Sequence, residues 1–168
     1  MSRKDRFQHV LILCTGNICR SPMAEALFRS QFNQPGFSVE SAGLAAPEGA
    51  PAEPHAVDLM AERGLDIRAH RARGVTAGML ERASLILTMD AEQQQTVVTT
   101  WPATHGRVRT LGRWSGVEVA DPYGYGKEAY KTALAAIECG VADWRHWLRT
   151  GAAPQSLLST WIKFFKAG

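Results

Sequence analysis

Short apolar runs separated by helical segments are the feature that most restricts how this 168-residue chain folds. The runs His9–Leu13 and Ser84–Met89 contain little polar alternation, which is typical of strands buried on both faces of a sheet. Strands that alternate with helices predict an α/β fold, a four-stranded parallel sheet flanked by helices on both faces. The predicted strands are His9–Leu13, Phe37–Ala42, Ser84–Met89 and Val108–Leu111.

The segments between these runs carry helix signals. Ser21 is expected at the N-cap of the first helix, with Pro22 at its first helical position. Shorter helices are expected at about 55–63, 76–83 and 91–100. A longer helix follows a loop rich in glycine and aromatic residues over 112–126. Its apolar stripe repeats every three or four residues and consists of Tyr130, Leu134, Ile137, Val141, Trp144 and Leu148.

Composition excludes several classes of protein. Three cysteines cannot build a disulfide framework, and they suit a reducing cytoplasm, which we take as the expected location. The net charge of +3 comes without a Lys/Arg-rich run, so nothing indicates nucleic acid as a partner. The apolar run near the N-terminus is too short for a transmembrane segment or a signal peptide.

The sequence predicts one domain over residues 1–151 and an amphipathic extension over 152–168. This extension could pack back on the domain, dock a partner or contact anionic lipid. The oligomeric state is not readable from the sequence. The apolar and basic residues of the extension are Leu157, Leu158, Trp161, Ile162, Lys163, Phe164, Phe165 and Lys166.

The segment from Cys14 to Pro22 has the residues that phosphate chemistry needs. It joins a strand to a helix N-terminus, where backbone N–H groups and the helix dipole favour an anion. The planar guanidinium of Arg20 can bind two phosphate oxygens at once. The positively charged environment favours the nucleophilic thiolate form of Cys14. The alternative is a packed cysteine beside a solvated arginine. The predicted phosphate loop, between the first strand and the first helix, comprises Thr15, Gly16, Asn17, Ile18, Cys19, Arg20 and Ser21.

This loop resembles that of the low molecular weight protein tyrosine phosphatases, most closely the bacterial branch linked to exopolysaccharide and capsule export. The resemblance covers about residues 7–150. It implies the same sheet, no metal or cofactor, phosphotyrosine proteins as substrates, and a bacterial tyrosine kinase of exopolysaccharide export as a partner. Besides the loop, the matching motifs are Ser41-Ala42-Gly43, His70-Arg71-Ala72-Arg73, Met89-Asp90 and Asp121-Pro122-Tyr123.

The resemblance also implies roles for single residues. Asp121 is the expected general acid, because a phenolate of pKa about 10 leaves poorly without a proton. Without the resemblance, Asp121-Pro122 would equally suit a turn. Asp90 is expected as structural support or as a helix N-cap, and Arg73 as structural support. Expected loop supports are Asn17, Ser21, Ser41 and His70, and expected pocket walls are Tyr123, Tyr125 and Trp114, of which Trp114 could equally lie in the core.

The chain departs from the family pattern at two positions. Gly124 stands where a bulky or charged residue is usual, which leaves the shape of the rim open, and Thr15 replaces a common aliphatic residue. In some family members the pair equivalent to Cys14 and Cys19 forms a protective disulfide under oxidation. The alternative for Cys19 is a packed thiol, and Cys139 is expected to be a bystander.

Three rival functions use the same loop. Arsenate reduction requires relay cysteines near residues 80–90, and that stretch contains none. Arginine phosphatases of this scaffold carry Thr where this chain has Ile18, so Ile18 favours phosphotyrosine. A binding module without catalysis would need neither Cys14 nor Asp121.

Overall fold

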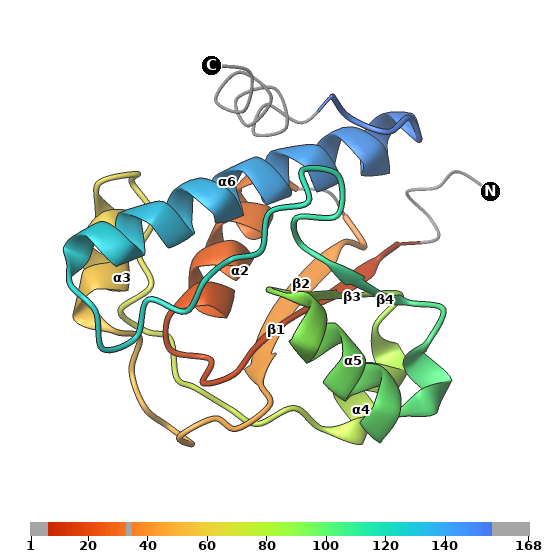
Figure 1. Ribbon diagram of the computed structural model, residues 1–168, viewed down its shortest axis with the longest axis horizontal. Coiled ribbons are helices and arrows are strands. Elements are labelled where there is room, and N and C mark those ends of the chain that lie inside the picture. The colour runs from red at the N-terminus through yellow and green to blue at the C-terminus, as the bar shows by residue number, and fades with distance from the viewer. Residues whose placement is uncertain (1–6, 33–34, 156–168) are drawn as a thin grey trace, which may run out of the picture.

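The computed structural model describes residues 7–32 and 35–155. Four parallel strands form one sheet in the order β2-β1-β3-β4, with helices against both faces (Figure 1). The predicted α/β class is therefore confirmed, and each predicted strand end is correct to within one residue. The strands are β1 His9–Cys14, β2 Ser38–Gly43, β3 Leu85–Thr88 and β4 Val108–Thr110.

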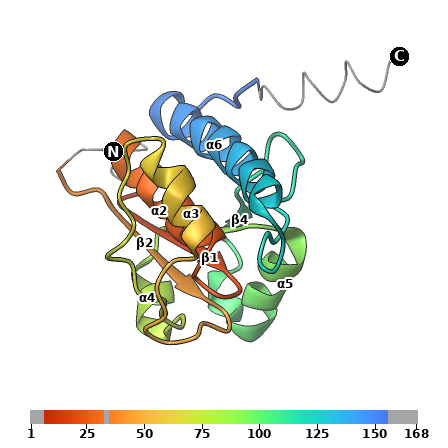
Figure 2. The ribbon, with the colours of Figure 1, turned by 90° about the vertical axis from the view of Figure 1, so that its left-hand side faces the viewer.

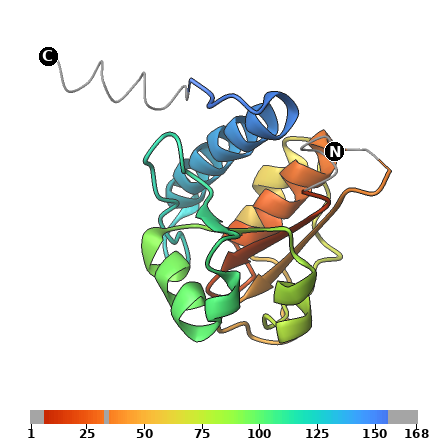
Figure 3. The same ribbon diagram turned by 90° about the vertical axis from the view of Figure 1, so that its right-hand side faces the viewer.

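Two helical layers enclose the sheet (Figures 2 and 3). Helices α2, α3 and α6 cover one face, whereas α4 and α5 cover the other. Strand β1 supplies side chains to both cores, because successive strand residues point to opposite faces. Val10 and Ile12 enter the first core, and Leu11 and Leu13 enter the second. The helices are α2 Arg20–Gln31, α3 Pro54–Ala61, α4 Ala77–Arg82, α5 Ala91–Thr100 and α6 Lys127–Thr150, with a 3₁₀ turn at Pro102–Thr104.

Helix α6 confirms the predicted apolar stripe, since all six of its residues are buried. Helix α5 has the predicted bounds, and Asp90 is its N-cap, because the carboxylate accepts a hydrogen bond of 2.7 Å from the Gln93 N–H. Thr76 caps α4 in the same way. Local capping chemistry therefore fixes where these two helices begin.

The prediction that Ser21 caps the first helix is wrong. Cys19 is the N-cap of α2, and it makes no side-chain capping bond. Ser21 lies inside the first turn and is fully buried. Its hydroxyl contacts the Cys14 thiol and the Asn17 amide instead of the helix backbone, so interactions within the preceding loop override the usual capping preference.

The sheet order places a topological switch point beside β1. The chain leaves β1 through α2 to reach β2 on one side, whereas β3 lies on the other side and connects through α5 to β4. Ligands of open α/β sheets bind in the crevice outside the carboxyl ends of such strands. The loops that follow β1 and β3 border this crevice.

Two further predictions concern the C-terminal extension and the absence of a membrane-spanning segment. The apolar residues expected in the C-terminal extension, from Leu157 onward, lie outside the described residues. Across 7–32 and 35–155, no helix is long and apolar enough to cross a bilayer.

Candidate active site

The loop after β1 turns its amides inward because its carbonyls are held from outside. The carbonyls of Cys14 and Thr15 accept hydrogen bonds from the N–H groups of residues 44 and 45, and that of Ile18 accepts one from residue 53. Since each trans peptide directs its N–H opposite its C=O, the amides of the following residues face the centre of the loop. Such a ring of amides is an anion site.

Asn17 holds the conformation of this loop. It is fully buried and has a φ of 53°, a left-handed conformation that asparagine tolerates better than most residues. Its side-chain oxygen accepts from the Arg73 N–H at 3.0 Å, which fixes the side-chain NH₂ as the donor to Ser21 and Ser41, each at 2.9 Å. His70 binds the Asn17 carbonyl at 2.7 Å, so Nε2 carries the proton.

The Cys14 sulfur receives donors from this network. The Asn17 backbone N–H lies 3.2 Å from Sγ, and the Ser21 hydroxyl lies 3.0 Å from it. Because Ser21 accepts from Asn17, its own proton is left for the sulfur. Both contacts stabilise a thiolate, which is the nucleophilic form of cysteine.

The network extends beyond the residues that the sequence indicated. The Ser41 hydroxyl donates to Glu25 at 2.5 Å, and Glu25 in turn pairs with Arg29 one helical turn further along α2. Nothing in the sequence distinguishes Glu25 from other helix-surface carboxylates. Only the packing of α2 against β2 places it under the loop.

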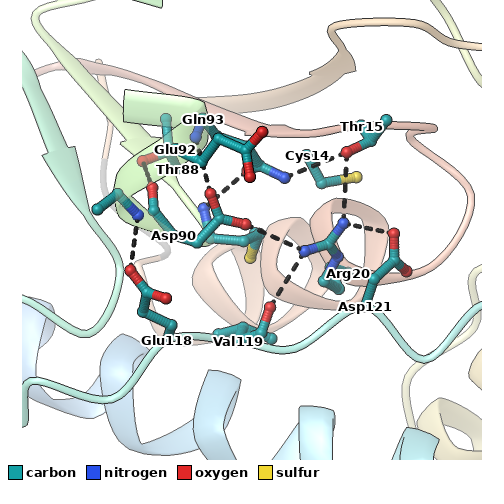
Figure 4. A network of polar contacts seen from close by, with 12 residues as sticks. Cys14, Thr15, Arg20, Thr88, Asp90, Glu92, Gln93, Glu118, Val119 and Asp121 are labelled. Atoms are coloured by element: carbon teal, nitrogen blue, oxygen red, sulfur yellow. Dashed lines mark hydrogen bonds and ion pairs between the residues drawn. The ribbon is translucent and has the colours of Figure 1, made fainter. Parts of the chain in front are cut away.

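Arg20 is the charged centre of the site (Figure 4). Its side chain is only 4% exposed. One Nη1 contact is the Val119 carbonyl at 3.1 Å, and a second is the Asp90 carboxylate at 3.5 Å. Nη2 lies 2.6 Å from Asp121 Oδ2 and, in a long contact, 3.5 Å from Thr15 Oγ1. Asp90 therefore both caps α5 and faces the guanidinium.

The segment that carries Asp121 is a tight turn beside the Arg20 guanidinium. The other carboxylate oxygen of Asp121 accepts from the Tyr123 N–H at 3.2 Å, and the Tyr125 N–H donates to the Pro122 carbonyl. Gly124 occupies the turn position with a φ of 81°. A positive φ at this point favours glycine, which gives a backbone reason for Gly124 in place of the bulkier residue.

A cavity of about 250 Å³ opens above the loop. Tyr123 lines it as predicted, and so do Ala45 and Pro47, which the sequence did not indicate. Of the other two expected wall residues, Tyr125 does not line this cavity and is 69% exposed. The remaining lining residues are Cys14, Thr15, Gly16, Ile18, Cys19, Arg20 and Asp121.

Trp114 is not a pocket wall either. Its ring packs edge-on against Trp144 with centroids 4.7 Å apart, and it also contacts Trp147. Both partners belong to α6, so Trp114 joins the core beneath that helix, which was the alternative prediction.

Cys19 is a buried thiol beside the loop. Its sulfur lies 3.4 Å from the Tyr130 hydroxyl, and burial raises the pKa of this thiol to about 12. At neutral pH Cys19 is therefore protonated. Cys139 lies on α6 and is not among the residues that line the cavity.

Comparisons with known proteins agree with this geometry. The family model for low molecular weight phosphotyrosine protein phosphatases matches residues 9–153. The probable low molecular weight protein-tyrosine-phosphatase EpsP of Ralstonia nicotianae is 47% identical, over 80% of this chain and 92% of that protein.

Two solved structures show the same fold. Wzb of Vibrio vulnificus in complex with benzylphosphonate has a TM-score of 0.78 at 30% identity, covering 83% of this chain and 98% of that one. The YwlE arginine phosphatase of Geobacillus stearothermophilus has a TM-score of 0.80 at 31% identity, covering 86% and 94%. By sequence and structure, the chain belongs to the low molecular weight protein tyrosine phosphatase family.

Proposed function

We propose that this protein hydrolyses protein phosphotyrosine through a phosphocysteine intermediate. One observation carries this proposal: the Cys14 thiol, the Arg20 guanidinium and the Asp121 carboxylate line a single cavity above an anion-binding loop. A nucleophile, a phosphate clamp and an acid are the three groups that this reaction requires.

In the first step, the Cys14 thiolate attacks phosphorus and the bond to the phenolic oxygen breaks. The Asp121 carboxylic acid gives its proton to that oxygen, so tyrosine leaves as a neutral phenol. In the second step, the Asp121 carboxylate takes a proton from a water molecule, the hydroxide oxygen attacks phosphorus, and Cys14 leaves as the thiolate. Arg20 and the loop amides bind the phosphoryl oxygens throughout.

The Arg20–Asp121 ion pair gives these steps an order. A carboxylate held against Nη2 at 2.6 Å has no proton to donate. A phosphoryl dianion competes for the same guanidinium edge, since arginine binds phosphate bidentately. Substrate binding therefore separates Asp121 from Arg20. The released carboxylate loses its ion-pair partner and takes up a proton from solvent, which it then donates to the leaving oxygen.

The substrate class follows from the walls. Tyr123 and Pro47 both line the cavity and offer surface to a flat aromatic ring, and the relatives' names specify tyrosine phosphatases. We further propose, from the resemblance to the exopolysaccharide branch, a bacterial tyrosine kinase of exopolysaccharide export as the physiological substrate. A cytoplasmic location would suit the thiolate nucleophile, because that compartment keeps thiols reduced.

Arginine phosphatase activity is the second candidate. The likeness to the YwlE arginine phosphatase favours it, because that fold match is as good as the one to Wzb. Ile18 opposes it: this apolar side chain lines the cavity, where a phosphorylated guanidinium would leave N–H groups unpaired.

A panel of phosphotyrosine, phosphoarginine and phosphoserine peptides tests the proposal. We expect the highest kcat/KM for phosphotyrosine and, after rapid acid quench, phosphate on Cys14. The Cys14→Ser variant should retain phosphate binding and lose turnover. Faster hydrolysis of phosphoarginine, or phosphate trapped on another residue, would contradict the proposal.

A further inference from the structure

Gln93 is a buried polar residue that the reaction described above does not use. It lies in the first turn of α5, and only 6% of it is exposed. Its side-chain oxygen accepts from the Met89 N–H at 3.0 Å, and its NH₂ group lies 3.3 Å from Thr15 Oγ1 (Figure 4). This contact crosses the switch point from the helix that follows β3 to the loop that follows β1.

The Met89 contact determines which way the Gln93 amide faces. A backbone N–H can only donate, so the atom beside it must be the amide oxygen. The NH₂ group is then left for Thr15, whose oxygen must accept. The second neighbour of that oxygen, Arg20 Nη2, is also only a donor.

Thr15 is therefore placed between two donors. Its single hydroxyl proton has no acceptor in either neighbour and must be directed elsewhere. Thr15 is an exposed residue that lines the cavity with Cys14 and Asp121. The proton is therefore available to a ligand that binds in that cavity.

We propose that the Thr15 hydroxyl donates a hydrogen bond to a phosphoryl oxygen of the substrate, and that Gln93 is the positioning residue that directs it there. The inference rests on the proposed phosphatase function, because it concerns a ligand in the same cavity. It adds a side-chain donor that an aliphatic residue at position 15 cannot supply.

Separate substitutions can remove the Thr15 hydroxyl or change the direction in which it donates. Thr15→Val keeps the branched shape of the side chain and removes the donor. Gln93→Glu keeps an acceptor for the Met89 N–H but places an acceptor beside Thr15, which turns the hydroxyl away from the cavity. Gln95→Glu adds the same charge to an exposed position of α5 and serves as the matched control.

The measurement is competitive inhibition by inorganic phosphate during hydrolysis of p-nitrophenyl phosphate, with melting temperatures to confirm folding. We expect Thr15→Val to weaken phosphate binding about 10- to 100-fold, the usual contribution of a hydrogen bond to a charged group. Thr15→Ser should recover most of that loss. Gln93→Glu should weaken binding in the parent, whereas Gln95→Glu should have a much smaller effect.

The double variant decides between orientation and charge. If Gln93 acts through Thr15, Gln93→Glu has little further effect in the Thr15→Val background. An equal effect in both backgrounds, or an unchanged inhibition constant for Thr15→Val, would overturn the inference. Failure of the parent to hydrolyse p-nitrophenyl phosphate at all would instead overturn the proposed function.

Discussion

Replacing Ser21 with alanine tests how the loop stabilises the Cys14 sulfur. Ser21 is fully buried, and Asn17 fixes its hydroxyl as a donor to Sγ at 3.0 Å. Hydrogen bonds to charged groups contribute roughly 1.5–3 kcal/mol. Since about 1.4 kcal/mol corresponds to a tenfold change, the step that expels the thiolate should slow about 10- to 150-fold.

The two chemical steps respond differently. Breakdown of phosphocysteine forms the thiolate and loses this stabilisation in full, whereas attack starts from a thiolate that the same bond stabilises. Breakdown should therefore limit turnover in Ser21→Ala. Stopped-flow mixing with p-nitrophenyl phosphate should show a burst of p-nitrophenol close to one equivalent per enzyme, followed by slow turnover.

Ser41→Ala is the matched control. Ser41 accepts from the same Asn17 NH₂ group but donates to Glu25, and its hydroxyl has no contact with the sulfur. It should lower stability without producing the burst. The reasoning is refuted if Ser21→Ala retains the parent's turnover with no burst, or if both variants give the same burst.

Four further predictions follow from the geometry. Asp121→Asn should slow phosphotyrosine hydrolysis by roughly 10²–10⁴; aryl phosphates with strongly acidic phenols should lose much less, and equal losses would make Asp121 a structural residue. Ile18→Thr should narrow the kcat/KM preference for phosphotyrosine over phosphoarginine by about 1–3 kcal/mol, and an unchanged ratio would remove Ile18 from specificity. Iodoacetamide at pH 8 should label Cys14 far faster than Cys19, because burial raises the pKa of Cys19 to about 12. After inactivation by peroxide, a dithiol should restore the activity of the parent more fully than that of Cys19→Ser, and equal recovery would exclude a protective Cys14–Cys19 pairing. Gly43→Ala should lower the free energy of unfolding by about 1–3 kcal/mol and reduce activity, because a Cβ there would lie 2.6 Å from the Thr15 carbonyl oxygen; retention of both parent values would show that the loop can yield.

The fold was predictable because its signals are local. Strands β1 and β3 are buried over nearly their whole length, so their residues form apolar runs that are recognisable without knowledge of their neighbours in the sheet. The stripe on α6 and the cap at Asp90 depend on residues within a few positions of one another. The strand order and the assignment of each helix to one face depend on packing, and the sequence did not predict them; only a parallel sheet covered on both faces followed from the general rules for α/β folds.

The residues of the candidate site also differ in whether their roles depend on nearby or on distant residues in the sequence. Cys14 and Arg20 lie in one short loop, so their spacing was visible in the sequence, whereas Asp121 needed the family resemblance. Gln93 and Glu25 were missed because their roles depend on contacts with residues 78 and 16 positions away. Ordinary helix residues of the same type would give the same sequence signal.

Ser21 does not take its predicted role as a helix cap, and Trp114 takes the core alternative instead of the pocket wall, and both outcomes have a common physical cause. Ser21 has a preferred local use as a helix cap, and Trp114 lies in a loop beside the expected acid. In each case an alternative partner outside the local segment is stronger: the buried Cys14 sulfur for Ser21, and an aromatic cluster under α6 for Trp114. Local preference decides the position of a side chain only where no buried tertiary partner competes for it.

Arg20 shows why the site requires this particular fold. Its guanidinium contacts the loop after β1 through Thr15, the loop after β3 through Asp90, and the segment before α6 through Val119 and Asp121. These segments meet only at the switch point of the sheet, and no contiguous peptide could supply them all. Because the same guanidinium edge serves both the acid and the phosphate, binding of a phosphoryl group and release of Asp121 are linked through one side chain. A substitution of Arg20 removes the phosphate clamp and also the partner that holds Asp121, so the effects of Arg20 and Asp121 variants are expected to be non-additive.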